Sequence, residues 1–111
     1  MNILVDQGTP VPLRKHLTEH TVATAYEQGW SSLTNGDLLD TAEQAGYDLL
    51  VTTDQNLRYQ QNLTTRQIAI LVLRSTSWPR IQQHVDAIRT AVEQMVSGAY
   101  AEVDILELEQ P

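Results

Sequence analysis

The chain contains no cysteine among its 111 residues. This absence excludes disulfide bridges, and it excludes zinc and iron–sulfur sites that depend on thiolate ligands. No apolar run approaches the roughly 20 residues that a helix needs to span a bilayer, and the N-terminus lacks the basic stretch of a signal peptide. We therefore expect a cytoplasmic protein that does not associate with membranes.

Basic residues are also scarce. Seven Lys and Arg stand against fourteen Asp and Glu, which gives a net charge of −7. The imbalance is largely C-terminal, because no Lys or Arg follows residue 90 whereas five acids do. Such a charge argues against a broad phosphate-binding surface. The charge does not exclude a local basic site, and the candidate residues for it are Arg14, Lys15, Arg58 and Arg66.

Short apolar segments alternate along the chain with segments of helical character. The pattern predicts strands over 3–5, 20–24, 49–53, 68–73 and 101–107. It predicts helices from Pro10 with Thr9 as the cap, over 35–46, from Leu57 to about Asn62, and over 78–97. This alternation is typical of a parallel α/β sheet. The predicted fold class is α/β: one domain over residues 1–111, with three α/β/α layers around a mainly parallel sheet of about five strands.

The polarity of the predicted strands indicates their places in the sheet. Residues 68–73 form the most apolar run of the chain, as expected of a central strand buried on both faces. The segment 20–24 is half polar, and the last strand over 101–107 is acidic. Both are therefore expected at the edges of the sheet.

Two of the predicted strands end on an aspartate. Asp6 follows the first strand, and Asp54 follows the third. Right-handed crossovers bring the carboxyl ends of parallel strands to one edge of the sheet, so the two carboxylates converge if their strands are neighbours. Asp37, at the start of the helix over 35–46, is the expected third partner, with Asp40 one turn along.

Carboxylates that converge repel one another, and their pKa values rise unless a cation neutralises them. Oxygen ligands without cysteine or clustered histidine favour Mg²⁺ or Mn²⁺, and such an ion can polarise a phosphoryl oxygen and assist deprotonation of water. A simpler interpretation stays open: Asp6 as a turn residue, Asp54 as a helix cap and Asp37 as a complement to a helix dipole. Spacing alone does not separate the two.

Other motifs carry less weight. Residues His16 to His20 match the H-x-x-E-H pattern of some zinc proteases, which needs both histidines on one continuous helix. A strand is expected from about His20, so that helical context is missing. Trp30 and Trp78 can stack on nucleic-acid bases, but covering the end of the core is the simpler role for each. The chain has no Gly-rich phosphate loop and no nucleophile elbow.

The chain resembles a compact branch of the PIN-like domains. The residues that carry the resemblance are Ile3-Leu4-Val5-Asp6, Asn35-Gly36-Asp37-Leu38-Leu39, Val51-Thr52-Thr53-Asp54-Gln55-Asn56-Leu57 and the apolar run over 68–73. This branch is similar to VapC-type toxin ribonucleases, many of which are encoded beside a small antitoxin. The resemblance extends over nearly the whole chain to about Arg74.

The resemblance implies roles for particular residues. Asp6, Asp37 and Asp54 would be the acidic catalytic triad that holds Mg²⁺ or Mn²⁺ for hydrolysis of an RNA phosphodiester. Asn56 stands where family members often have a fourth carboxylate, and Gln7 stands where they often have Glu. An amide oxygen can still bind a hard cation but brings no charge, so one metal and two metals are open alternatives.

Further candidates are weaker. Asp40 and Gln7 are the weaker metal ligands, and Arg14 and Arg58 are the expected RNA contacts. The family also implies a small antitoxin protein as partner and a homodimer as an assembly.

Three functional hypotheses follow. The leading one is a metal-dependent endoribonuclease, the toxin of a toxin–antitoxin pair. The second is a catalytically weak PIN-like interaction module that holds a partner with its C-terminal helix and acidic tail. The third is a phospho-acceptor receiver-like domain, a class that typically has an acidic pair after the first strand and a late lysine. Here position 7 is Gln and no lysine follows Lys15.

Overall fold

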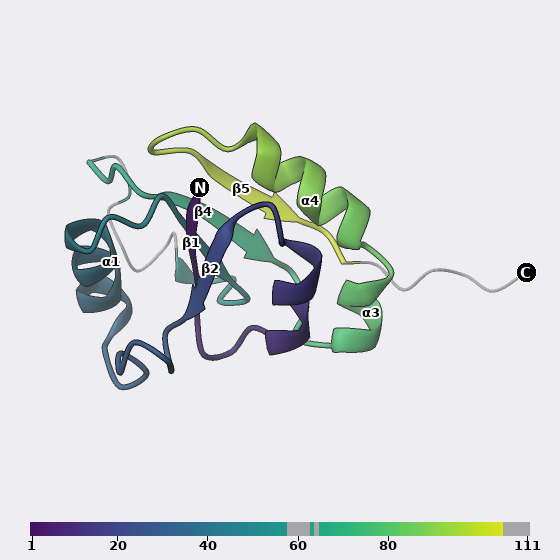
Figure 1. Ribbon diagram of the computed structural model, residues 1–111, viewed down its shortest axis with the longest axis horizontal. Helices are drawn as coiled ribbons and strands as arrows, with labels where there is room; N and C mark the ends of the chain where they lie inside the picture. The colour runs from purple at the N-terminus through teal and green to yellow at the C-terminus, as the bar shows by residue number, and fades with distance from the viewer. Residues whose placement is uncertain (58–62, 64, 106–111) are drawn as a thin grey trace, which may run out of the picture.

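The computed structural model describes residues 1–57, 63 and 65–105. Five strands in this part of the chain form one sheet in the order β2-β1-β3-β4-β5 (Figure 1). Every neighbouring pair is parallel. The strands are β1 (Asn2–Val5), β2 (Thr21–Thr24), β3 (Leu49–Thr52), β4 (Ala69–Leu73) and β5 (Tyr100–Val103). The predicted α/β class with a parallel sheet of about five strands is confirmed.

The helices cover both faces of the sheet and give it two cores. On one face, α1 (Asn35–Gln44) packs its buried stripe against β1, β3 and β4. On the other face lie the 3₁₀ helix η1 (Val11–His16), α3 (Trp78–Gln82) and α4 (Val85–Gln94) (Figure 1). Successive strand residues alternate between these cores, as the period of two in a strand requires. The expected three layers are therefore present.

The strand positions agree with their polarity. All four residues of β3 and all five of β4 are buried, whereas β5 is half-buried throughout. The most apolar strands thus lie inside the sheet, and the expected edge strands β2 and β5 lie at its two edges. Strands buried on both faces need continuous apolar runs, and the three inner strands β1, β3 and β4 have them.

The order of the strands creates a switch point between β1 and β3. From β1 the chain crosses to β2 on one side, and from β3 it continues to β4 on the other side. Loops that leave two neighbouring strands in opposite directions open a crevice at the carboxyl ends of those strands, where α/β proteins bind ligands. Asp6 and Asp54 follow these two strands.

The single helix predicted over 78–97 is wrong. The structure has two helices, α3 and α4, separated at Gln83 and His84. The backbone N–H groups of these two residues donate to the carbonyls of Arg80 and Ile81, three positions back instead of four, at 3.1 and 2.9 Å. This 3₁₀-type tightening ends α3 and turns the chain before α4 begins. Ile81 of α3 and Ile88 of α4 are nevertheless both fully buried, so the two helices pack into the same core.

Other boundaries also differ from the prediction. Thr9 does not cap the helix that follows it: Pro10 is the N-cap residue, and the Thr9 hydroxyl donates to Asp6 instead. Thr34 caps α1 through its side chain, and Gly46 turns the chain afterwards with a φ of 88°. The last strand spans Tyr100–Val103 in place of 101–107, and its predicted end beyond residue 105 lies outside the described residues. So does most of the helix predicted from Leu57 to about Asn62.

No helix in the part of the chain that the structure describes is long and apolar enough to cross a membrane.

Two valines near the end of α4 offer a test of the core. Val92 lies on the inner face of α4 and is fully buried, whereas Val96, which follows the helix, is 68% exposed. Val92→Ala should lower the free energy of unfolding by roughly 2–3 kcal/mol, because it removes two buried methyl groups and leaves a cavity. Val96→Ala, the matched control, should change it by less than about 0.5 kcal/mol. Urea denaturation followed by circular dichroism measures both, and equal effects would contradict the assigned packing.

Candidate functional site at the carboxyl ends of β1 and β3

Asp6 sits directly after β1 and is held against β3. Its backbone N–H donates to the carbonyl of Val51 at 3.1 Å, which extends the strand pairing to the edge of the sheet. One carboxylate oxygen accepts a hydrogen bond from the Thr9 hydroxyl at 2.7 Å, and the other accepts one from the Thr52 hydroxyl. Because two hydroxyl groups fix it, the carboxylate has a defined orientation.

Thr52 links Asp6 to Asp54. Its side chain is buried, and its hydroxyl donates to Asp6 while accepting the backbone N–H of Asp54 at 3.0 Å. One buried hydroxyl therefore positions both candidate ligands. β-branched Thr suits the last position of a strand, and here its hydroxyl satisfies groups that the sheet leaves unpaired.

Asp54 is anchored from both sides of its turn. Its Oδ1 accepts the backbone N–H of Asn56 at 2.9 Å, an Asx turn typical of aspartate after a strand. Its Oδ2 accepts the side-chain amide of Asn35 at 2.8 Å. Asn35 is the first residue of α1, so this bond ties the start of α1 to the end of β3. The predicted convergence of the first and third strand ends is confirmed.

The charge of Asp54 acts on the carboxyl group of Asp6. Burial raises the pKa of Asp6 above its ordinary value, and the negative charge of Asp54 raises it further. Hydrogen bonds from Thr52 and Thr9 act in the opposite direction, because they favour the charged form. A cation beside the pair would relieve both the desolvation and the repulsion.

The donor set fits one hard cation held by two carboxylates. Mg²⁺ commonly binds proteins through one or two carboxylates, with waters and substrate phosphates completing its shell. A carboxylate has about four lone-pair sites, so Asp6 and Asp54 keep acceptor capacity beyond their present hydrogen bonds. Within residues 1–57, 63 and 65–105, no three His, Cys, Asp or Glu side chains are grouped so that they could hold a metal, and the larger site stays a prediction.

Asp37 and Asp40 are not brought to the pair. Asp37 is exposed in the first turn of α1, and its backbone N–H donates to the Thr34 hydroxyl at 3.4 Å. Asp40 forms an ion pair with Arg66, which also lies 3.6 Å from Glu43. The place next to Asp54 that was predicted for Asp37 is taken by Asn35, because the first turn of α1 directs that side chain toward β3. The assignment of Asp37 as a ligand stays a prediction.

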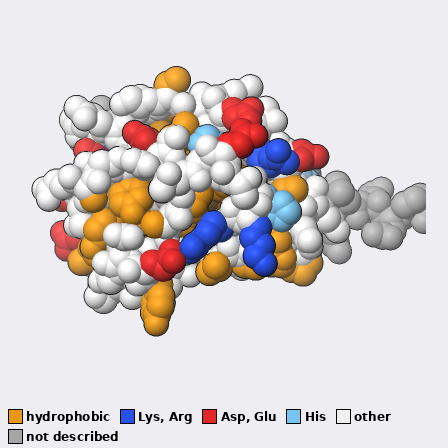
Figure 2. All heavy atoms as spheres, viewed as in Figure 1, with side chains coloured by type: hydrophobic (Ala, Val, Ile, Leu, Met, Phe, Trp, Pro, Cys, Tyr) orange, Lys and Arg blue, Asp and Glu red, His pale blue; other side chains and the backbone are white. Residues whose placement is uncertain are grey.

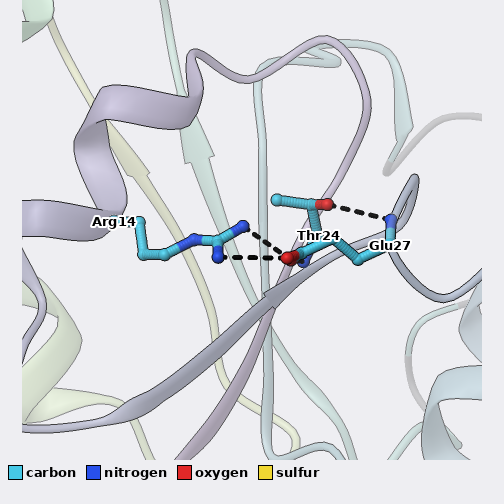
Figure 3. A network of polar contacts seen from close by, with 3 residues as sticks. All are labelled: Arg14, Thr24 and Glu27. Carbon is cyan, nitrogen blue, oxygen red and sulfur yellow. Dashed lines mark hydrogen bonds and ion pairs between the residues drawn. The ribbon is translucent and has the colours of Figure 1, made fainter.

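The remaining predicted residues are spread around the site. Gln7 follows Asp6 and is exposed. Asn56 is also exposed, and its backbone N–H donates to Asp54. Arg14 makes a bidentate ion pair with Glu27, at 2.6 and 3.2 Å, and the Thr24 backbone completes this network (Figure 3). The Arg14 hydrogen bonds hold the pKa of Glu27 below its ordinary value. Arg58 lies outside the described residues.

Sequence reasoning missed a cation at this edge. Arg74 follows β4 directly, and its guanidinium donates to the Gln55 side chain at 3.4 Å and to Asp104 at 2.8 Å. Gln55 is the neighbour of Asp54, so Arg74 lies beside the candidate site. The available signal was its position: Arg74 ends the most apolar strand, just as the two aspartates end theirs. On the face shown in Figure 2, blue basic side chains form separate patches rather than a continuous field.

The H-x-x-E-H residues do not form a zinc site. His16 ends the 3₁₀ helix η1, and His20 precedes β2, so they share no continuous helix. His16 instead contacts Trp78, with ring centroids 5.7 Å apart.

Comparisons with family models, with curated proteins and with solved structures found no match for the chain. The resemblance to PIN-like domains therefore stays an expectation from the sequence motifs.

Two substitutions should move the pKa of Asp6 in opposite directions. Asp54→Asn removes a negative charge, so the pKa should fall toward its ordinary value, whereas Thr52→Val removes a hydrogen bond to the carboxylate, so it should rise further. Carbon-13 NMR titration of the Asp6 carboxyl group measures both shifts. Asp86→Asn is the control, because Asp86 is an exposed residue of α4. An unchanged pKa in Asp54→Asn would show that the carboxylates are too far apart to share a cation.

The same shift gives a sign for stability. A raised pKa means that the folded state binds this proton more tightly than the unfolded state does. The contribution of Asp6 is therefore fully present below the unfolded pKa and is lost as the pH rises through the folded pKa, a dependence that Asp6→Asn should remove.

Proposed function

We propose that the protein is a metal-dependent endoribonuclease whose centre is the Asp6–Asp54 pair. The observation that carries this proposal is the convergence of two half-buried carboxylates at the topological switch point of a parallel sheet, with the pKa of Asp6 raised by burial and by its partner. Perturbed carboxylates in such a crevice are typical of functional sites. The PIN-like motifs supply the reaction class.

The chain's own residues would hold and orient one Mg²⁺ or Mn²⁺. Asp6 and Asp54 would be its ligands, while Thr9, Thr52 and Asn35 fix the direction of their oxygens. The ion would supply charge stabilisation at a phosphoryl oxygen and a more acidic bound water. Such outer hydrogen bonds typically change metal affinity or activity by about 10–100-fold.

Arg74 would contact a phosphate of the substrate. It is held beside Gln55 at the same edge as the carboxylates, and its guanidinium suits bidentate recognition of a phosphate. In a chain of net charge −7, one placed arginine and one bound cation would provide the local attraction that the overall charge does not.

The biological setting rests on the resemblance alone. We infer an RNA substrate in the cytoplasm, control by a small antitoxin protein, and assembly as a homodimer, as in the VapC-type toxins.

A second function is favoured by one observation: the third acid expected of the triad does not join the pair among the described residues. A PIN-like interaction module needs no complete metal site, and it would use the C-terminal part of the chain to hold a partner. The two functions differ in whether their cellular effect depends on Asp6 and Asp54.

Removing either carboxylate should abolish cleavage. Asp6→Asn and Asp54→Asn should each lower the rate on mixed single-stranded RNAs more than about a hundredfold, beyond the usual cost of losing an outer hydrogen bond to a metal ligand. Asp37→Asn should have a smaller effect, because Asp37 is exposed and apart from the pair. Gel assays with Mg²⁺ or Mn²⁺ measure the rates.

Calorimetric titration of Mn²⁺ separates the outcomes. The wild type should bind Mn²⁺ and the Asp6→Asn/Asp54→Asn double variant should not. If Asp37→Asn loses as much activity as Asp54→Asn, the triad assembles only with metal or RNA. If the wild type binds no metal at millimolar concentration and the double variant retains its cellular effect, the interaction module is the better assignment.

Arg74 should contribute to RNA binding through one phosphate. Arg74→Gln should weaken binding of a short single-stranded RNA several-fold and lower the slope of log affinity against log salt by about 0.7, the value per phosphate contact on single strands. Arg89→Gln is the matched control, because Arg89 also pairs with an aspartate and has the same 49% side-chain exposure. Fluorescence anisotropy at several salt concentrations measures both, and equal slopes would contradict the role of Arg74.

A further inference from the structure

A small hollow adjoins Asp6 on the side of α1. Its volume is about 130 Å³, and the residues that line it include Asp6, Gln7, Trp30, Ser31 and Asn35. It shares Asp6 with the carboxylate pair, and it shares Asn35, whose amide donates to Asp54. A larger hollow of about 390 Å³ lies near the starts of β3 and β4, where Gly46, Asp48 and Ala69 line it. Of these two hollows, only the smaller is lined by Asp6.

The wall of the hollow suits a flat, partly polar ring. Trp30 provides an aromatic surface, and Ala25, Leu33 and Leu38 add apolar contacts. Trp30 is half-buried and meets Tyr47 in a T-shaped contact, with ring centroids 5.9 Å apart, which fixes its indole. The lining thus combines apolar contacts with several convergent polar groups, and convergent polar groups are a feature of ligand sites.

The polar groups of the hollow match the edge of a nucleobase. Gln7, Ser31 and Asn35 line it with amide and hydroxyl groups, which as side-chain types both donate and accept hydrogen bonds. Proteins that recognise single-stranded RNA stack unpaired bases on aromatic side chains and hydrogen-bond the base edges in this way.

The size of the hollow limits the ligand to about one ring. The volume of about 130 Å³ is close to that of a cavity of about 150 Å³ that is known to hold benzene, so it favours one six-membered ring over a larger two-ring base.

We propose that this hollow binds one unstacked pyrimidine base of single-stranded RNA, next to the phosphate that the carboxylate pair would cut. The proposal rests on the nuclease function for its substrate, and it adds a requirement: the RNA must be unpaired at the cut, with a pyrimidine beside it. Double-stranded RNA keeps its bases stacked and cannot fill the hollow.

The tryptophans allow a direct binding test without cleavage. The chain has two, and Trp78 packs against the core on the opposite face of the sheet from Trp30. In the Trp78→Phe protein, Trp30 fluorescence should be quenched by tetracytidylate in EDTA, where no metal supports hydrolysis. A tetramer of abasic nucleotides has the same phosphates but no rings, and tetra-adenylate has larger rings. The abasic tetramer should bind between about fivefold and a hundredfold more weakly, as expected for loss of one stacked base, and tetra-adenylate should also bind more weakly.

Variants of the wall provide the control. Trp30→Leu should weaken binding of tetracytidylate at least fivefold, Trp30→Phe should restore it to within about twofold, and Trp78→Leu should leave it unchanged. If Trp30→Leu does not fold, Ser31→Tyr tests the same point, because Ser31 is an exposed residue of the rim and a tyrosine there fills the hollow. Equal affinities for the tetracytidylate and abasic tetramers, or for tetracytidylate and tetra-adenylate, would overturn the proposal.

Failure of this proposal is distinguishable from failure of the nuclease function. Quenching by tetracytidylate in a protein that cuts no RNA would support the base site and reject the nuclease. Carboxylate-dependent cleavage without quenching, and without an effect of Trp30→Leu, would support the nuclease and reject the base site.

Discussion

The pairing of β1 with β3 is the constraint on which the core and the candidate site both depend. The register places Ile3, Leu4 and Val5 opposite Leu49, Leu50 and Val51. A slip by one residue would exchange the two faces of a strand and move each core side chain to the wrong helix layer. The same register carries Asp6 past Val51 to the Thr52 hydroxyl. The apolar pattern that makes the fold unique therefore also aligns the carboxylates.

The local polar network compensates for placing acids near the core. Asp6 is half-buried, and burial of a carboxylate is costly unless hydrogen bonds or a counter-charge offset it. The Thr9 and Thr52 hydroxyls offset part of that cost, while Asp54 increases it. Retaining two acids at this edge thus works against stability, which is the usual balance at functional sites.

Much of the fold could be predicted from the sequence because it depends on apolar periodicity and strand polarity. This pattern predicted the buried strands β3 and β4 and placed the more polar strands at the edges of the sheet. The break between α3 and α4 was not predicted, because neither Gln83 nor His84 is a helix breaker, so the local sequence does not indicate the 3₁₀-type hydrogen bonds that end α3. The convergence of Asp6 and Asp54 followed from handedness and strand order. Strand order and handedness do not determine which side chain of the first turn of α1 faces β3. In the structure Asn35, rather than Asp37, contacts Asp54.

The distance along the chain between Asp6 and Thr52 has a consequence for synthesis. Thr52 and Asp6 are separated by 46 positions, and α1 and β2 lie between them. At about 5–20 residues per second, a ribosome needs roughly 2–10 s to extend the chain from one to the other. Throughout that interval β1 lacks its partner on one side, and Asp6 lacks both its buried hydroxyl and its fellow carboxylate. The pair of carboxylates therefore cannot assemble on a nascent chain that lacks β3, and it forms only when β3 pairs with β1.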